Sequence, residues 1–285
     1  DVVAYKTIRS TEFAGHGLPN MIYVDIPHDL LANSNVVLHS TPSTPHDMAS
    51  LAVTNSFGMP SRSRANLEED IPKANSLCQD GQVMIVSVVG TPSSESAEHG
   101  HGISKGENYT SLVRDFVDIS LFAKKCGAKI IEANFSCPNV ATGEGSIFQN
   151  ANAVLDIGSA ITAAIGDTPL IIKVGTFQDT DSMSQVFKAA QQAKIASVCG
   201  INSVSMKVVD PVSNQPALGP TRISSGVCGG PIRGIGIDFI KKAKEIVNKE
   251  QLNLALVGCG GITTAEHFDE YLQAGAAVAM SATGM

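Results

Sequence analysis

The sequence is poor in aromatic and charged residues. Its 285 residues include no tryptophan, and aromatic residues make up only 5% of the chain, whereas a β-sandwich would be expected to use more of them. Charged residues account for 16% and apolar residues for 43%, so the chain can bury a large core and is not a disordered polymer. The formal net charge of −7 argues against a nucleic-acid partner, because an acidic surface repels phosphates.

Long apolar runs and paired cysteines are also missing. No segment has the ~18 consecutive apolar residues that a membrane span needs, so we expect no membrane partner. The six cysteines include no Cys-x-x-Cys pair, which argues against a disulfide framework or a structural zinc site and favours a reducing cytoplasm. The sequence starts with Asp1 rather than Met, so we expect it to begin inside a longer gene product.

Several common ligand-binding motifs are absent. No G-x-G-x-x-G follows a predicted strand, and neither G-x-x-x-x-G-K-[ST] nor G-x-S-x-G occurs, which disfavours Rossmann, P-loop and α/β-hydrolase sites. The His99-Gly-His101 pair has no identifiable third ligand, so a solvated loop is favoured over a metal site. We therefore predict no bound metal.

What the sequence does contain is a repeat of short apolar runs and amphipathic stretches. The runs are rich in Val, Ile and Ala, as in the buried strands of parallel sheets, and helical patterns occupy 110–126, 238–248 and 263–273. Such a β-then-α repeat requires a parallel sheet with right-handed crossovers, either open or closed into a barrel. The predicted strands are Val2–Lys6, Met84–Gly90, Lys129–Asn134, Leu170–Gly175, Ala196–Ser203, Leu254–Gly258 and Ala277–Ser281.

Two segments interrupt this repeat. Residues 25–50 carry three prolines and many Ser, Thr and Asn residues, which predicts a long excursion on the surface. Residues 91–108 are rich in Ser, Gly and His. Long loops in a compact domain are usually functional lids or mobile segments.

The most informative stretch is I-I-E-A-N-F-S-C-P-N-V at residues 130–140. A buried strand is followed at once by Asn134, Ser136, Cys137 and Asn139, at the strand end that forms the active face of a barrel. Two amides on either side of a thiol can hold a planar, hydrogen-bonding ligand while the thiolate removes a proton from it. A buried cysteine before a Pro-Asn turn has the same spacing, so the residues alone leave both interpretations open.

Other strand ends carry glycines and amides. N-S-F-G-M-P at 55–60 is compatible with amide recognition, although a plain turn looks similar. G-C-G-G-I at 258–262 offers backbone N–H groups at a helix N-terminus, which suits an anion, and the next predicted strand ends in S-A-T-G at 281–284. Loops after the last two strands of a barrel frequently form a phosphate site, although packing requirements explain either glycine segment equally.

Two lysines end apolar strands. A cation at such a position is costly unless it faces a ligand or a carboxylate, and the alternative is a side chain that extends to solvent. For Lys6 both interpretations stay open. For Lys173, which follows Leu-Ile-Ile, we favour the ligand interpretation.

Together these segments resemble class 1 dihydroorotate dehydrogenases, which are FMN enzymes of pyrimidine synthesis built on a TIM barrel. N-F-S-C-P-N at 134–139 is similar to the family's N-L-S-C-P-N, and N-S-F-G-M-P at 55–60 is similar to N-S-M-G-L-P. The Y-K-T-I segment from Tyr5 resembles the family's lysine strand. The segment that contains Lys173 and the segments at 258–262 and 281–284 occur in the same order as in the family. The resemblance covers nearly the whole chain, apart from 25–50.

The resemblance implies a role for each matching residue. Cys137 would be the base that removes the C5 proton of dihydroorotate while the C6 hydride passes to flavin N5. Lys173 would lie at the N1/O2 edge of the flavin, where its charge stabilises the reduced form. The implied substrate-binding residues are Lys6, Asn55, Gly58, Met59, Asn134, Asn139, Asn202 and Ser203. The implied FMN-binding residues are Lys6, Thr7, Asn134, Lys173, Asn202, Gly229, Gly260, Gly261 and Thr283, with a further FMN contact from Ser203.

The resemblance also implies an α/β fold of the TIM (β/α)8 type, as one FMN-binding domain over residues 1–285 with a surface insertion at 25–50. Seven predicted strands are one short of eight, so we expect the first strand, and a helix after Met285, to lie outside this sequence. A homodimer is implied. The electron acceptor would be fumarate, or NAD through an electron-transfer subunit.

Three alternatives remain at this point. A dihydropyrimidine dehydrogenase-like enzyme would keep FMN, but its similar loop usually has His where Asn139 stands, and Asn139 favours a carboxylated pyrimidine. A barrel that binds a nucleotide without turnover is disfavoured by the retained Cys137 and lysines. A cysteine hydrolase lacks a histidine at any recognisable partner position.

Overall fold

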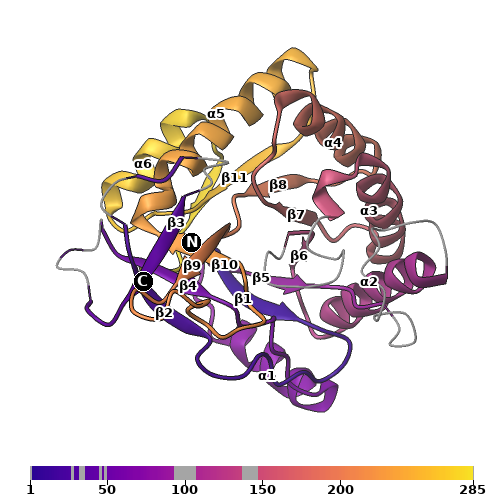
Figure 1. Cartoon of the computed structure of the whole chain (residues 1–285). Helices are drawn as coiled ribbons and strands as arrows, with labels where there is room; N and C mark the ends of the chain where they lie inside the picture. Colours follow the sequence, from indigo (N-terminus) through magenta and orange to yellow (C-terminus); the bar gives the residue numbers. More distant parts are fainter. Residues whose placement is uncertain are drawn as a thin grey trace.

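The computed structural model describes residues 2–26, 29–31, 36–44, 47, 50–92, 107–136 and 147–284. Within them, seven parallel strands form the main sheet in the order β1-β5-β6-β7-β8-β11-β12. All seven predicted strands are confirmed to within a few residues at each end, and the curved sheet with its outer helices (Figure 1) has the predicted TIM-barrel type of fold. These strands are β1 (Val2–Ile8), β5 (Val83–Val88), β6 (Ile130–Asn134), β7 (Leu170–Val174), β8 (Ser197–Gly200), β11 (Ala255–Cys259) and β12 (Val278–Met280).

Alternation along each strand separates the two faces of the main sheet. In β6, Ile131 and Ala133 belong to the large core beneath the helices, whereas Ile130 packs with a smaller apolar cluster inside the barrel. The centre of that inner cluster consists of Ile85, Ile171, Cys199 and Val257, one from each of four strands. Since successive residues of a strand face opposite sides, Glu132 and Asn134 of β6 share the inner face with Ile130.

Helices surround the outer face of the main sheet (Figure 1). Apolar residues at helical spacing explain why they pack there: α3, for example, buries Val154, Ile157, Ile161 and Ile165. Among the described residues, no helix combines the length and hydrophobicity that crossing a bilayer requires. The helices are α1 (Arg64–Ser76), α2 (Glu107–Lys125), α3 (Ala151–Ile165), α4 (Thr180–Gln192), α5 (Arg233–Lys249), preceded by the short η3 (Gly230–Ile232), and α6 (Ala265–Ala274).

Five further strands form a small closed barrel that the sequence analysis did not predict. In Figure 1 they lie together on one side of the curved main sheet. They are β2 (Met21–Asp25), β3 (Val37–Thr41), β4 (Ala52–Asn55), β9 (Val204–Val209) and β10 (Ser225–Gly229). Strand β3 lies within the predicted excursion at 25–50, pairs with β2 and β9, and buries Leu38 and Ser40. Part of that excursion is therefore regular, paired structure.

The connections explain where the small barrel sits. Strands β2, β3 and β4 follow the carboxyl end of β1, and β9 and β10 follow the carboxyl end of β8. Parallel strands end at the same edge of a sheet, so both excursions start from the face that carries the active site in TIM barrels. The small barrel is thus placed next to the strand ends that the sequence analysis selected.

Candidate active site

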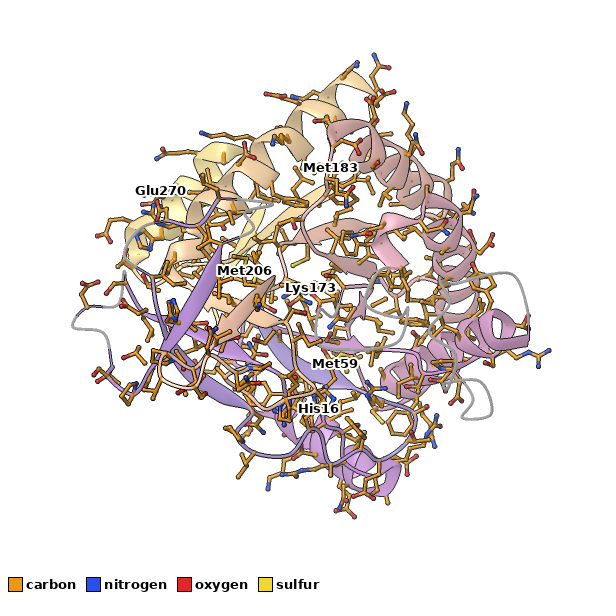
Figure 2. The ribbon with its side chains drawn as sticks, in the orientation of Figure 1. His16, Met59, Lys173, Met183, Met206 and Glu270 are labelled. Carbon is orange, nitrogen blue, oxygen red and sulfur yellow. The ribbon has the colours of Figure 1, made fainter. Side chains whose placement is uncertain are left out.

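A cavity of about 740 Å³ lies at the carboxyl ends of the main-sheet strands. Its walls come from β1, β6 and β7, from the segments after β8, β11 and β12, and from β2, β4 and β10 of the small barrel. Figure 2 shows Lys173 and Met59 toward the middle of the ring of strands, whereas Met183 and Glu270 lie on the outer helices. The volume is within the range of ~300–1,000 Å³ that is typical of small-molecule sites.

All of the predicted site residues that the structure describes line this one cavity. Cys137 and Asn139 fall outside the described residues, so the base and its neighbouring amide stay predictions. The predicted residues that line the cavity are Lys6, Thr7, Asn55, Gly58, Met59, Asn134, Lys173, Asn202, Ser203, Gly229, Gly260, Gly261 and Thr283.

Asn134, at the end of β6, and Asn202, which follows β8, are held by each other and by backbone groups. Asn134 Oδ1 accepts a hydrogen bond from the backbone N–H of Ser136 at 3.2 Å. Asn202 Nδ2 donates to Asn134 Oδ1 at 3.4 Å and to the backbone carbonyl of Ser136, and Asn202 Oδ1 accepts from the N–H of Ser203 at 2.8 Å. These bonds fix the planes of both amides at the point where the chain leads toward Cys137.

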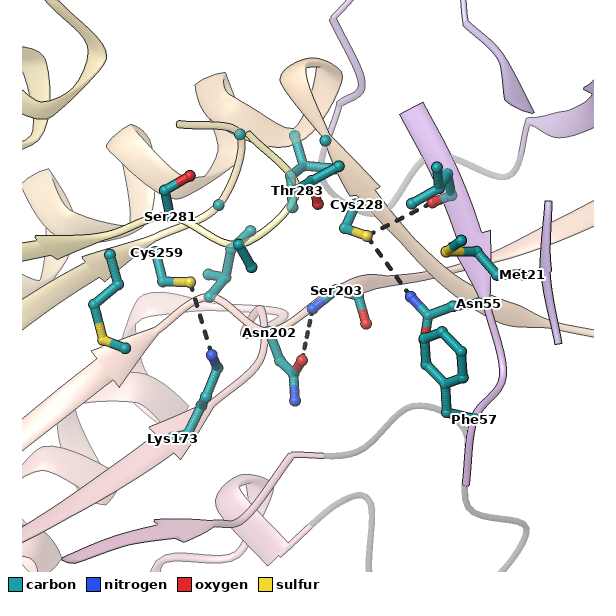
Figure 3. Close-up of a pocket in the computed structure, with 18 of the residues that line it drawn as sticks. Met21, Asn55, Phe57, Lys173, Asn202, Ser203, Cys228, Cys259, Ser281 and Thr283 are labelled. Atoms are coloured by element: carbon teal, nitrogen blue, oxygen red, sulfur yellow. Dashed lines mark hydrogen bonds between the residues drawn. The ribbon is translucent and has the colours of Figure 1, made fainter. Parts of the chain in front are cut away.

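A third asparagine, Asn55, enters the cavity from the small barrel. Its Nδ2 donates to the carbonyl of Gly226 at 3.3 Å and contacts Cys228 Sγ at 3.6 Å, and Cys228 Sγ in turn faces the carbonyl of Val53 at 3.7 Å (Figure 3). Burial raises the pKa of the Cys228 thiol, so this thiol stays protonated at neutral pH. Cys228 therefore supports the orientation of Asn55 as a neutral thiol.

The two predicted cations lie in different surroundings. Lys173, partly exposed to the cavity, donates from Nζ to Cys259 Sγ at 3.7 Å (Figure 3). The charges of Cys259, Cys199 and Glu132 raise the pKa of Lys173 above its usual value, against the opposing effect of burial. Lys6 donates to the carbonyl of Pro60, and burial, together with the charge of Arg62, lowers its pKa. Lys173 is thus a stable cation at neutral pH.

Comparison with known proteins identifies the family of this architecture. Residues 40–285 match the family model described as dihydroorotate dehydrogenase. A dihydroorotate dehydrogenase of Dictyostelium discoideum is 44% identical over 291 residues, covering 100% of this chain and 75% of that protein. The chain belongs to the dihydroorotate dehydrogenase family.

More distant relatives in the dihydroorotate dehydrogenase family carry two different names. One from Lactobacillus delbrueckii subsp. bulgaricus, named dihydroorotate dehydrogenase A (fumarate), is 31% identical over 57% of this chain and 50% of its own length. One from Maridesulfovibrio salexigens, named dihydroorotate dehydrogenase B (NAD(+)), catalytic subunit, is 26% identical over 62% of this chain and 55% of its own length. The alignments with these bacterial relatives span about half of their length.

Dihydroorotate dehydrogenases are flavin-dependent, and one end of the cavity fits the phosphate of such a cofactor. Gly260 and Gly261 have positive φ angles of +127° and +69°, which L side chains rarely adopt. A Cβ on Gly261 would lie 2.5 Å from the backbone N of Arg233, so this loop packs directly on the start of α5. Backbone N–H groups beside helix N-termini favour anions. Gly229 and Thr283 line the same cavity.

The rest of the cavity fits a flat, largely apolar ring in this family. Ile201, Ile232, Ile262 and Met280 line it beside the three asparagines and Lys173, which is the mixture of apolar walls and few polar groups that small-molecule sites show. The residues present therefore fit a flavin that carries a phosphate, with the glycine loop for the phosphate and Lys173 for the polar edge of the ring.

Sequence reasoning missed about half of the lining of this dihydroorotate dehydrogenase cavity. Cys259 lies within the glycine-rich segment at 258–262 that the sequence analysis selected, but neither Cys259 nor Cys228 was assigned a role. The others are mostly apolar, and an apolar side chain in a cavity has no spacing that separates it from a core residue. The further lining residues are Met21, Tyr23, Leu51, Val53, Phe57, Pro60, Ile201, Ile232, Ile262, Met280, Ser281 and Ala282.

Proposed function

We propose that this chain is a dihydroorotate dehydrogenase, an FMN-dependent oxidoreductase that converts dihydroorotate to orotate in pyrimidine biosynthesis. One observation carries the proposal beyond family membership. Residues assigned separately to substrate and cofactor, on β1, β4, β6, β7, β10 and the segments after β8, β11 and β12, line a single cavity. The residues that the resemblance assigns to substrate and to cofactor therefore lie together, as a direct hydride transfer between the two would require.

The chain's own residues supply orientation and proton transfer. The amides of Asn55, Asn134 and Asn202 offer hydrogen-bond donors and acceptors in fixed positions to the polar ring amides and the carboxylate of dihydroorotate. Cys137 follows Ser136, whose backbone N–H is held by Asn134, and in the proposal its thiolate removes the C5 proton. FMN, when bound, would accept the C6 hydride at N5. Lys173 supplies a buried positive charge that favours the reduced, more negative cofactor.

The test is a visible spectrum of the purified protein followed by anaerobic mixing with dihydroorotate. We expect a yellow protein whose flavin absorbance is lost on mixing, and no loss with dihydrouracil. The Cys137→Ala variant should stay yellow and lose flavin absorbance about 10²- to 10⁴-fold more slowly, which is the usual contribution of a general base.

A matched control is Cys78→Ala, because Cys78 does not line the cavity. This variant should reduce its flavin at the rate of the unmodified protein. A colourless protein would contradict the FMN assignment, and unchanged reduction kinetics in Cys137→Ala would remove Cys137 from the mechanism.

The electron acceptor and the homodimer stay predictions. The names of the relatives include both fumarate and NAD(+), so reoxidation of the reduced protein is to be measured with fumarate and with NAD separately. Reoxidation by fumarate alone would support direct transfer. Reoxidation by NAD only after addition of an iron–sulfur flavoprotein would support an electron-transfer subunit.

A further inference from the structure

Two consecutive residues after β4, Gly58 and Met59, line the cavity in an unusual backbone conformation. Their φ angles are +73° and +57°, and a residue with a side chain, such as methionine, rarely adopts a positive φ. Among the described residues, neither backbone N–H donates a hydrogen bond. Backbone of this kind persists only where the surrounding structure holds it in place.

The buried side chain of Arg9 holds this backbone from outside the cavity. Arg9 follows β1, is 7% exposed and does not line the cavity. Its Nε donates to the carbonyl of Met59 at 3.2 Å, and its Nη2 donates to the carbonyl of Gly58 at 3.3 Å. Its Nη1 donates to Thr91 Oγ1 at 2.7 Å, so all three guanidinium nitrogens are engaged. A planar guanidinium with fixed donor directions suits two neighbouring carbonyls.

The held carbonyls determine where the N–H groups point. In a trans peptide, such as that between Gly58 and Met59, the C=O and the N–H point in opposite directions. The carbonyl of Gly58 is turned toward Arg9, so the N–H of Met59 is turned away from Arg9. The carbonyl of Phe57 accepts from the N–H of His16 at 2.9 Å, so the N–H of Gly58 is turned away from His16. Neither Arg9 nor His16 lines the cavity, so both N–H groups face it.

Arg9 also places a positive charge behind these two amides. Among the ion pairs of the described residues, none includes Arg9, and its three nitrogens donate to uncharged oxygens. A buried cation is costly without a compensating charge. Adjacent backbone N–H groups bind anions, and an anion bound at these two would lie one peptide group away from the guanidinium.

We propose that Arg9 is a positioning residue for the carboxylate of the substrate. It holds the carbonyls of Gly58 and Met59 away from the cavity, so that the N–H groups of both residues face the carboxylate. The inference rests on the proposed function, which supplies a substrate with a carboxylate on its ring. If Arg9 only stabilised the fold, its removal would weaken the binding of ligands with and without a carboxylate alike.

The test compares the binding of orotate and of uracil to the FMN-loaded protein, followed by the change in the flavin spectrum. In Arg9→Gln we expect the affinity for orotate to fall about 10- to 100-fold, the usual contribution of hydrogen bonds to a charged group. The affinity for uracil should stay the same, because uracil lacks the carboxylate. Equal losses for the two ligands, or no loss for orotate, would overturn the proposal.

Arg9→Lys separates the geometry of the side chain from its charge. Lysine keeps the charge but lacks the planar arrangement of donors, so this variant should recover only part of the affinity for orotate. Full recovery in Arg9→Lys would show that the charge alone acts, and would overturn the positioning role.

Arg222→Gln is the matched control. Arg222 also donates to two backbone carbonyls, those of Pro19 at 2.6 Å and Gly17 at 2.8 Å, but none of these three residues lines the cavity. This variant should bind orotate as the unmodified protein does. A loss equal to that of Arg9→Gln would show that any loosened loop has the same effect, and would overturn the specific role of Arg9.

Two further measurements decide the matter where Arg9→Gln does not fold or orotate does not bind. Thr91→Val removes the hydroxyl that accepts from Arg9 and keeps the shape of the side chain, so it should weaken orotate binding in the same direction but by less. Unchanged affinity in Thr91→Val would count against the proposal. If the unmodified protein binds no orotate, the proposed function fails. A crystal structure of Arg9→Gln with the carbonyls of Gly58 and Met59 in their original directions would overturn the positioning role by itself.

Discussion

Substitution of Gly261 tests the assignment of the glycine loop to the cofactor phosphate. In Gly261→Ala the new Cβ would lie 2.5 Å, 2.6 Å and 2.7 Å from the backbone N, the Cβ and the Cα of Arg233. Optimal separations of such atoms are near 3.5–4.0 Å, and two of the three neighbours are backbone atoms at the start of α5. The loop must therefore move away from α5.

The cost of that change has two parts. A positive φ of +69° costs any non-glycine residue about 1 kcal/mol. Overlap with a packed neighbour costs a further ~1–3 kcal/mol. The free protein relieves the overlap by moving the loop, whereas bound FMN requires the original loop geometry. We therefore expect the cost of the overlap, ~1–3 kcal/mol, to appear as a loss of FMN affinity of roughly 5- to 150-fold.

Gly81→Ala is the matched control for this substitution. Gly81 has a similar φ of +83°, but a Cβ there would have nothing within 4 Å, and the residue does not line the cavity. The assay is titration of the FMN-free protein with FMN, followed by the quenching of flavin fluorescence. Equal dissociation constants for Gly261→Ala and the unmodified protein would refute the reasoning, as would an equal loss of affinity in Gly81→Ala.

Two further predictions concern hydroxyl groups of tyrosines. The buried Tyr271 donates to the carbonyl of Gly260 at 2.6 Å, so Tyr271→Phe should cost about 1–2 kcal/mol and lower the melting temperature by about 2–8 °C in calorimetry. An unchanged melting temperature would show that this bond contributes nothing. Burial and the hydrogen bond to Asp70 raise the pKa of Tyr5 to about 12, above its value of ~10 in an unfolded chain. The stability that the neutral Tyr5 phenol gives to the folded state is complete below about pH 10 and is lost as the pH rises toward 12. The free energy of unfolding in urea should therefore fall more steeply between these pH values in the unmodified protein than in Tyr5→Phe. Parallel curves for the two proteins would contradict this.

The main sheet was predictable because its strands are short apolar runs bounded by polar residues. Leu170–Val174 carries one polar residue in five, and its ends were predicted within a residue. The small barrel was not predictable in the same way, since β4 has four residues and its pairing with β2 and β10 depends on the distant sequence. Strand β9 does alternate in burial over most of its length, and that pattern was a usable signal.

The site was largely predictable where chemistry requires a particular residue type at a strand end. Asn134 and Lys173 lie opposite each other in the register of two neighbouring strands, so their meeting follows from the β-α repeat itself. Cys228 follows from no such rule, because it reaches the cavity only through the antiparallel pairing of β10 with β4.

Residues of both sheets line the same cavity, and this arrangement affects how the protein unfolds. A tightly bound ligand in this cavity stabilises the packing of the two sheets against each other, because its binding free energy is lost as soon as they separate. Depletion of that ligand should loosen the five-stranded unit first, while the larger sheet stays intact under its shell of helices.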